Sequence, residues 1–210
     1  ATSGRQPTTL SRGESSFLGL YAKLADRAIR LHDQCQSPTN QVFIAVAGGP
    51  GSGKSTVSEM VSDIVNKKLE RQASVVLPMD GYHTTRARLQ EMGDTAVNLG
   101  QVIGDPESAS NGKSTSYLDL LARRGSPWTF DSETLVKDFR AAKETGEAVL
   151  PTYSRDRSDP VPGGVTLTKE HEIVFCEGLY LCAFDSPDWA PLEELWEDVW
   201  YVRAPEDIIL

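Results

Sequence analysis

The sequence predicts a three-layer α/β/α domain built around a mostly parallel β-sheet. Two apolar runs rich in β-branched residues, at 42–47 and 74–79, are typical of strands covered on both faces. Between them, apolar residues recur at helical spacing over 57–69. The order strand, helix, strand is the βαβ unit of a parallel sheet. We expect further central strands near 172–177 and 198–203.

Composition is typical of one soluble globular domain. The chain has 210 residues, of which 39% are hydrophobic and 24% are charged, enough for a substantial core. Its formal net charge of -9 argues against non-specific binding to nucleic acid, which depends on Lys and Arg. We therefore expect no nucleic-acid partner.

Cysteine usage and the polar start of the sequence favour a cytoplasmic protein. Cys35, Cys176 and Cys182 are an odd set without metal-ligand spacing, so we expect reduced structural thiols. The first residues lack the apolar segment of a signal peptide, and no apolar stretch approaches the length that spans a membrane. We expect no membrane partner.

The N-terminal region is expected to hold a tail and a helix. Residues 1–15 are rich in Ser, Thr and Gly, which predicts a flexible tail. Apolar residues then recur at helical spacing over 17–31, which predicts a helix with one buried stripe. The folded domain is expected to cover 16–210.

A phosphate-binding motif, GGPGSGKST, lies between the first strand and the helix that follows it. Its spacing G-x-x-x-x-G-K-S is complete, and this context predicts the P-loop nucleoside triphosphate hydrolase fold. Inward N–H groups and the helix N-terminus favour phosphate. The lysine can neutralise the β and γ phosphates, and the serine after it can coordinate magnesium. The expected nucleotide-binding residues are Gly48, Gly49, Pro50, Gly51, Ser52, Gly53, Lys54, Ser55 and Thr56.

A partial copy of this motif, NGKST at 111–115, lacks the same context. Glu107 stands where the first glycine would be, and no apolar strand precedes the copy within 104–116. We expect an exposed insertion that does not bind phosphate.

Two acids are expected at the carboxyl edge of the sheet, where open α/β folds bind ligands. Asp80 follows the second strand, and its carboxylate could accept a proton from an attacking hydroxyl or could cap the next helix. Glu177 ends the third strand. Its carboxylate could hold or orient the ligands around a magnesium ion, or it could have a purely structural role. Tyr82 and His83 follow Asp80 and are candidates for lining a substrate pocket.

Three classes of nucleotide-binding protein are compatible with the P-loop: a GTPase, a motor or chaperone ATPase, and a small-molecule kinase. The guanine-recognition pattern N-K-x-D is missing. The most similar string, NKKL at 66–69, lacks the Asp. The acid after the second strand favours the kinase, with ATP and Mg²⁺ as cofactors. A nucleotide-binding protein or weak ATPase without productive transfer is the alternative.

From about Gln41 onward, the sequence resembles the P-loop kinases that include uridine kinase, phosphoribulokinase and bacterial-type pantothenate kinase. The resemblance is carried by MDGYH, RRGSPWTFD, YSRDRSDPV and CEGLYL, in this order. It implies transfer of the ATP γ-phosphate to an alcohol group of a small polar metabolite. It also implies that Asp80 is the catalytic base and that Lys54 and Arg155 complete the catalytic set, with Arg155 near the substrate and the transferring phosphate. Arg124 is a further candidate for substrate binding.

The sequence departs from this family at three places. Gly125 stands where uridine kinases place an Asp that contacts the ribose, so uridine is not the expected substrate. Trp128 replaces an acid and is either a pocket wall or a core residue. The chain ends at Leu210, where family members continue with a helix, an arginine-bearing lid and a last strand. The resemblance therefore implies that these elements are missing and that transfer is impaired more than ATP binding.

Two further segments have local predictions. Asp131 is best explained as the N-cap of a helix over 132–144. The prolines within 147–170 predict an irregular flap on the substrate side. Neither the identity of the phosphate acceptor nor the oligomeric state follows from the sequence.

Overall fold

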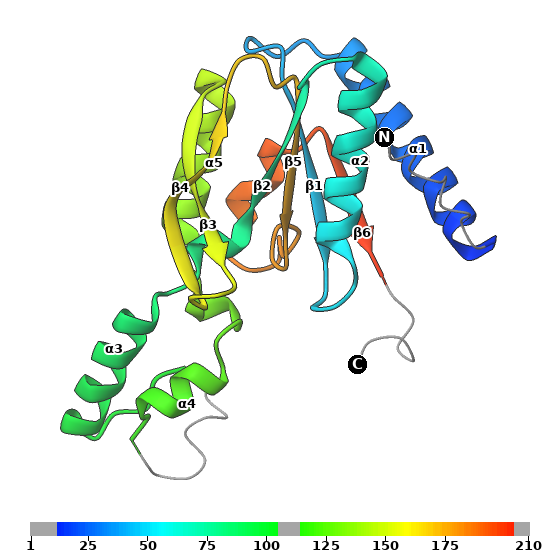
Figure 1. Cartoon of the computed structure of the whole chain (residues 1–210). Coiled ribbons are helices and arrows are strands. Elements are labelled where there is room, and N and C mark those ends of the chain that lie inside the picture. Colours follow the sequence, from blue (N-terminus) through cyan, green and yellow to red (C-terminus); the bar gives the residue numbers. More distant parts are fainter. Residues whose placement is uncertain (1–11, 105–113, 204–210) are drawn as a thin grey trace, which may run out of the picture.

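The centre of the protein is a four-stranded parallel sheet with the order β2-β5-β1-β6 (Figure 1). The computed structural model describes residues 12–104 and 114–203. The strands are β1 (Val42–Gly48), β2 (Ser74–Pro78), β5 (Ile173–Gly178) and β6 (Asp198–Val202). They lie where the sequence predicts central strands, so the α/β fold class with a parallel sheet is confirmed.

Strand β1 determines how the two faces of the sheet are packed. All seven of its residues are buried, because helices or other segments cover both faces. Its side chains alternate between the faces, as strand geometry requires. Val42, Ile44 and Val46 belong to one apolar cluster, whereas Phe43 and Ala45 belong to the other. This explains why the strand reads as a continuous apolar run.

Helices form the two outer layers. Helices α1 (Arg12–Asp33) and α2 (Lys54–Leu69) pack on one face, through Ala25 and Ala28 of α1 and Val61 and Val65 of α2. The opposite face carries α5 (Ser132–Thr145) and the short 3-10 helix η4 (Ala190–Leu195) (Figure 1). The predicted helices over 17–31, 57–69 and 132–144 are therefore confirmed.

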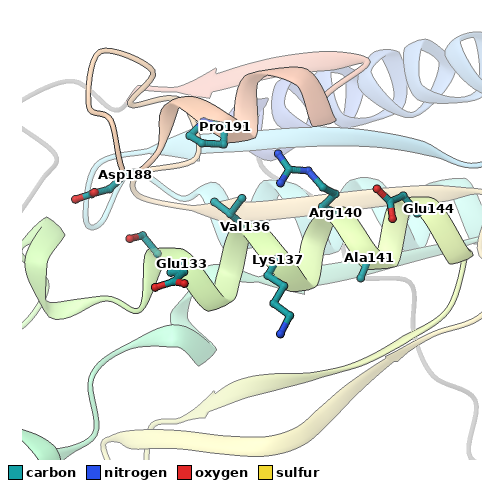
Figure 2. Close-up of a pocket in the computed structure, with 9 residues that line it drawn as sticks. Glu133, Val136, Lys137, Arg140, Ala141, Glu144, Asp188 and Pro191 are labelled. Carbon is teal, nitrogen blue, oxygen red and sulfur yellow. The ribbon is translucent and has the colours of Figure 1, made fainter.

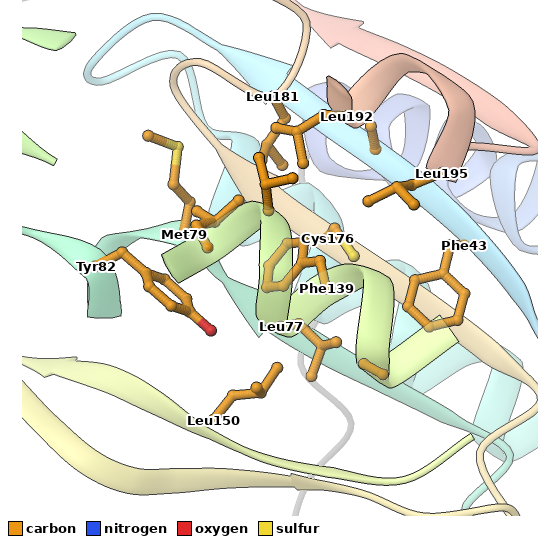
Figure 3. Close-up of a cluster of buried hydrophobic side chains, with 14 of the residues drawn as sticks. Phe43, Leu77, Met79, Tyr82, Phe139, Leu150, Cys176, Leu181, Leu192 and Leu195 are labelled. Carbon is orange, nitrogen blue, oxygen red and sulfur yellow. The ribbon is translucent and has the colours of Figure 1, made fainter. Parts of the chain in front are cut away.

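The core under α5 is the larger apolar cluster (Figure 3). Phe139 points from α5 towards the sheet and lies among Phe43, Leu77 and Cys176. Its exposed fraction is 0%, and Tyr82 and Trp196 contact its ring edge-on. Aromatic side chains of this kind contribute a large share of core stability.

The segment from 147 to 170 is regular, which contradicts the predicted irregular flap. It forms an antiparallel hairpin of β3 (Ala148–Ser154) and β4 (Asp159–Leu167). The register shifts between Leu150 and Thr152, so that Pro151 and Pro162 fall within an irregularity of the pairing. In a two-stranded ribbon both strands are edges, where prolines are tolerated. The prolines therefore mark a bulge rather than a loss of pairing.

Helices α3 (Arg86–Leu99) and α4 (Tyr117–Ala122) project from the body at one end (Figure 1). The partial motif copy between them falls mostly at 105–113, outside the described residues. Thr115 is buried, and its backbone N–H donates to the Gln101 carbonyl oxygen at 2.9 Å. This end of the segment is therefore packed, contrary to the expected exposure throughout.

Several smaller expectations can be compared directly with the structure. Cys35, Cys176 and Cys182 are all free thiols, as predicted. Asp131 caps α5, since its Oδ1 accepts from the Thr134 backbone N–H at 3.0 Å. Within residues 12–104 and 114–203, no helix combines the length and apolar character needed to cross a membrane.

We expect Phe139→Ala to lower the free energy of unfolding by about 3–5 kcal/mol, because it leaves a cavity beneath α5. The measurement is chemical denaturation followed by circular dichroism. Leu118→Ala is the matched control, since Leu118 is 71% exposed on α4 and should change stability by less than about 0.5 kcal/mol. Equal losses from both variants would contradict the position of Phe139 in the core.

Candidate active site

The P-loop connects the end of β1 to the first turn of α2. Gly53 is the N-cap of α2 and has φ 88°, a left-handed conformation that favours glycine. No side chain caps this end of α2. Its first N–H groups are therefore left for an anion, and the helix dipole adds partial positive charge at the same place.

A pocket of about 410 Å³ opens beside the P-loop, at the carboxyl edge of the sheet. It is built by α2, the segment after β2, strand β3 and the end of β5. Its lining residues are Ser55, Glu59, Pro78, Asp80, His83, Thr152, Tyr153, Arg155 and Glu177. Five residues singled out in the sequence therefore meet in one pocket.

Glu177 lies at the end of β5, between Val46 of β1 and Pro78 of β2. Only 6% of its surface is exposed, and the Ser55 hydroxyl donates to its Oε2 at 3.1 Å. Burial raises the pKa of this carboxyl, and the nearby charge of Asp80 raises it further, while Lys54 and the Ser55 hydroxyl oppose the shift. Glu177 thus carries a buried carboxylate directly beside the P-loop serine.

Ser55 and Glu177 offer two hard oxygen ligands of the kind that Mg²⁺ prefers. Among the described residues, no group of three or more His, Cys, Asp or Glu side chains is arranged to hold a metal ion. A magnesium ion at this place would therefore take its other ligands from phosphate and water, which is its usual coordination in nucleotide sites. The residues present fit that arrangement.

Asp80 lies in the short 3-10 helix η1 (Met79–Tyr82), which follows β2 directly. Its side chain is 42% exposed and lines the pocket. The cap of the next helix, α3, is Thr85, whose Oγ1 accepts from the Arg88 backbone N–H at 3.1 Å. The alternative that Asp80 caps this helix is therefore wrong, and its carboxylate faces the pocket instead.

His83 forms part of the pocket wall between two aromatic rings. Its ring centroid lies 4.0 Å from that of Phe130 and 5.1 Å from that of Tyr153. Nδ1 is 2.8 Å from the backbone oxygen of Asp80, and because a carbonyl oxygen only accepts, Nδ1 carries the hydrogen. Burial lowers the pKa of His83, partly opposed by the hydrogen bond and charge of Asp80, so the ring is neutral near pH 7.

Tyr82 does not line this pocket, which corrects the sequence-based prediction. It is 4% exposed in the core beneath α5, and its hydroxyl donates to Asp138 Oδ2 at 2.9 Å (Figure 3). Burial, followed by the Asp138 contact, raises the pKa of this hydroxyl. In a 3-10 turn, residues three apart share a face. Asp80 and His83 therefore point to the pocket together, while Tyr82 between them points away.

Arg124 is also outside the pocket lining, in contrast to its predicted role in substrate binding. Its side chain is 8% exposed and forms an ion pair with Asp159 at 2.6 Å. Nη2 also donates to the Thr84 carbonyl oxygen at 2.8 Å, and Nη1 donates to the Ser158 carbonyl oxygen and the Tyr153 hydroxyl. Arg124 therefore ties the hairpin to the start of α3.

Trp128 belongs neither to this pocket nor to the buried core clusters. It is half-buried, and the Arg123 guanidinium carbon lies 5.7 Å from the ring centroid. The ring is thus a partner for Arg123, an outcome that neither of the two sequence-based alternatives anticipated.

The sequence-based reasoning missed several residues of the pocket. Glu59 lies four residues after Ser55 on α2, so helical spacing places both on one face and would have found it. Thr152 and Tyr153 come from β3, which was not expected to be a strand. Gly81 explains how β3 reaches the pocket, because a Cβ there would lie 2.3 Å from the Pro151 carbonyl oxygen. The glycine allows the hairpin to rest directly on η1.

A second hollow, of about 610 Å³, lies along the outer side of α5 and reaches Asp188 and Pro191 (Figure 2). Its walls carry mixed charges, including Glu133, Lys137 and Arg140. None of the site residues predicted from the sequence lines it. The smaller pocket, where the P-loop serine and the strand-end acids meet, is therefore the candidate active site.

Comparison with known proteins agrees with the fold and with the P-loop motif. The sequence profile of the Phosphoribulokinase / Uridine kinase family matches residues 43–208. The Schizosaccharomyces pombe protein "Putative uridine kinase C227.14" is 28% identical over 190 residues, which cover 90% of this chain and 69% of that protein. The pantothenate kinase of Nocardioides sp. is 26% identical over 79% of this chain and 44% of its own length. The Escherichia coli protein YggC is 26% identical over 84% and 62%, so the chain spans less than two thirds of two of these relatives.

Solved structures share the same fold. The "putative fructose transport system kinase" from Silicibacter sp. TM1040 superposes with a TM-score of 0.69 at 25% identity, over 90% of this chain and 77% of that one. YFH7 from Saccharomyces cerevisiae gives a TM-score of 0.60 at 19% identity, over 83% and 79%, a likeness of fold alone. Because the family profile covers most of the chain, including the P-loop and both strand-end acids, this chain belongs to the Phosphoribulokinase / Uridine kinase family.

Proposed function

We propose that the protein is an ATP-dependent kinase that transfers the γ-phosphate to a hydroxyl of a small polar metabolite. The observation that carries the proposal is the pocket in which Ser55, Glu177 and Asp80 meet beside the N-terminus of α2. A P-loop alone would support nucleotide binding. A half-exposed carboxylate in the same pocket supports transfer to an acceptor.

The nucleotide end of the site is assigned to the loop from Gly48 to Thr56. Its backbone N–H groups would hold the phosphates, and the Lys54 ammonium would neutralise them. Ser55 and Glu177 would hold a magnesium ion, which supplies positive charge to the β and γ phosphates when bound. The hydrogen bond between these two side chains supports their assignment to one ion.

The acceptor end of the site is assigned to Asp80 and Arg155. The acceptor hydroxyl oxygen bonds to the γ-phosphorus while the bond to the β-phosphate oxygen breaks, which releases ADP. Asp80 takes the hydroxyl proton in this step. Arg155 lines the pocket from the turn between β3 and β4, and its guanidinium would stabilise charge on the transferring group. The names of the relatives, which include uridine kinase and pantothenate kinase, support a small acceptor without selecting one.

The proposal is tested by measuring ADP release from ATP across a panel of metabolites with free hydroxyl groups. An increase that depends on one metabolite, with a phosphorylated product found by mass spectrometry, supports the kinase. ATP hydrolysis that no metabolite stimulates would favour the alternative of a weak ATPase without productive transfer.

Asp80→Asn should lower the rate of phosphate transfer by about a hundredfold to ten-thousandfold, the range expected when a general base is lost. ATP affinity should stay within about threefold, because the amide preserves the size of the side chain. Single-turnover transfer and ATP titration measure the two effects separately. Asp63→Asn, an exposed acid on α2, is the control. Normal transfer by Asp80→Asn would remove Asp80 from the mechanism.

Lys54→Ala should weaken ATP binding by about tenfold to more than a hundredfold, which corresponds to roughly 1.5–3 kcal/mol for a charge-assisted contact. Isothermal titration calorimetry measures the change. Lys113→Ala is a control matched in sequence context, because Lys113 occupies the lysine position of the partial motif copy. A similar loss in both variants would contradict the assignment of the P-loop.

A further inference from the structure

The pocket described above offers a ligand many hydrogen-bond acceptors and few cations. Three of its lining side chains are acids, namely Glu59, Asp80 and Glu177. Arg155 is the one lysine or arginine among its lining residues. A carboxylate has only acceptor oxygens at neutral pH and needs a cation or N–H donors when it leaves water. A hydroxyl group can donate to each of these acceptors.

Arg124 lies near the pocket, but its guanidinium group already forms hydrogen bonds within the protein. Nη1 and Nη2 of Arg124 bind oxygens of Thr84, Tyr153, Ser158 and Asp159. Its side chain is 8% exposed, and its charge is paired with the Asp159 carboxylate. Arg124 therefore has neither the free charge nor the exposure to hold a carboxylate on a substrate.

His83 adds an uncharged acceptor to the pocket wall. Its Nδ1–H is engaged by the Asp80 carbonyl oxygen, which leaves a lone pair on Nε2. Among the described residues, no hydrogen-bond partner reaches this Nε2. Burial lowers the pKa of the ring, so the lone pair is present at neutral pH. Nε2 can accept a hydrogen bond from a hydroxyl but would repel a carboxylate oxygen.

We infer that the acceptor pocket binds an uncharged polyhydroxylated molecule, such as a sugar or sugar alcohol, and discriminates against hydroxy acids. The inference rests on the proposed kinase function and on the assignment of Arg155 to the transferring phosphate. Glu59 and Asp80 would accept hydrogen bonds from its hydroxyl groups, and His83 Nε2 would accept one more, while Glu177 stays with the magnesium ion. A substrate carboxylate would face Glu59 and Asp80 without a cation of its own.

The test uses matched pairs in which a polyol and an acid have the same number of carbons: glycerol with D-glycerate, and D-arabinitol with D-arabinonate. D-Ribose and D-fructose extend the neutral series. Phosphorylation is measured with ATP and Mg²⁺ for every compound. We expect at least one polyol or neutral sugar to be phosphorylated with a kcat/KM at least about tenfold above that of every acid tested. Equal or better turnover of an acid would overturn the inference and would leave the kinase function supported.

The remaining outcome separates the two proposals. Transfer to no compound of either series would overturn the inference. It would also contradict the kinase function only if the wider metabolite screen found no acceptor, with ATP binding intact. An acid found as the substrate in that screen would overturn the inference alone.

Variants at His83 test the proposed contact directly. His83→Phe should fit between the rings of Phe130 and Tyr153 but lacks an acceptor, so KM for the neutral substrate should rise about fivefold to tenfold. His83→Gln keeps an amide oxygen and should stay within about threefold. KM for ATP should not change in either variant. An unchanged KM for the neutral substrate in a folded His83→Phe protein would overturn the contact.

Discussion

The pairing of β5 with both β1 and β2 is the constraint on which the site depends. Strand β5 comes after β3 and β4 in the chain, yet its parallel register between β1 and β2 places Glu177 beside Val46 and Pro78. The strand ends therefore bring the P-loop, Glu177 and Asp80 to one edge. Burying the Glu177 carboxylate is costly unless it has a partner, and the Ser55 hydroxyl satisfies part of that requirement. The strand pairing thus positions Glu177, and the P-loop serine in turn stabilises the buried carboxylate at the end of β5.

Local sequence rules predicted much of the frame and part of the site. The apolar runs located the four central strands, and the G-x-x-x-x-G-K-S spacing located the turn into α2. Asp131 was identified as a helix cap because capping depends on neighbours only three residues away. These features depend on short-range geometry, which a single sequence reveals.

The errors concern residues whose roles depend on distant partners. Tyr82 and Arg124 are chemically suited to a substrate pocket, but Asp138 and Asp159 take up their polar atoms instead. Neither pairing has a signature in the local sequence. The prolines near Pro151 suggested an irregular segment, although β3 and β4 pair around a bulge. The sequence pattern therefore could not show which hydrogen-bond donor pairs with which carboxylate across the fold.

The contact between Gly81 and Pro151 has a mechanical consequence. Backbone meets backbone there, so no flexible side chain can absorb a relative displacement of η1 and the hairpin. Arg124 adds a second tether between the hairpin and the start of α3. Asp80 and Arg155 therefore belong to one stiff unit, although Asp80 lies in η1 and Arg155 lies in the turn between β3 and β4. A side chain at position 81 would push η1 and the hairpin apart. It would therefore change the distance between Asp80 and Arg155 while leaving both side chains chemically unchanged.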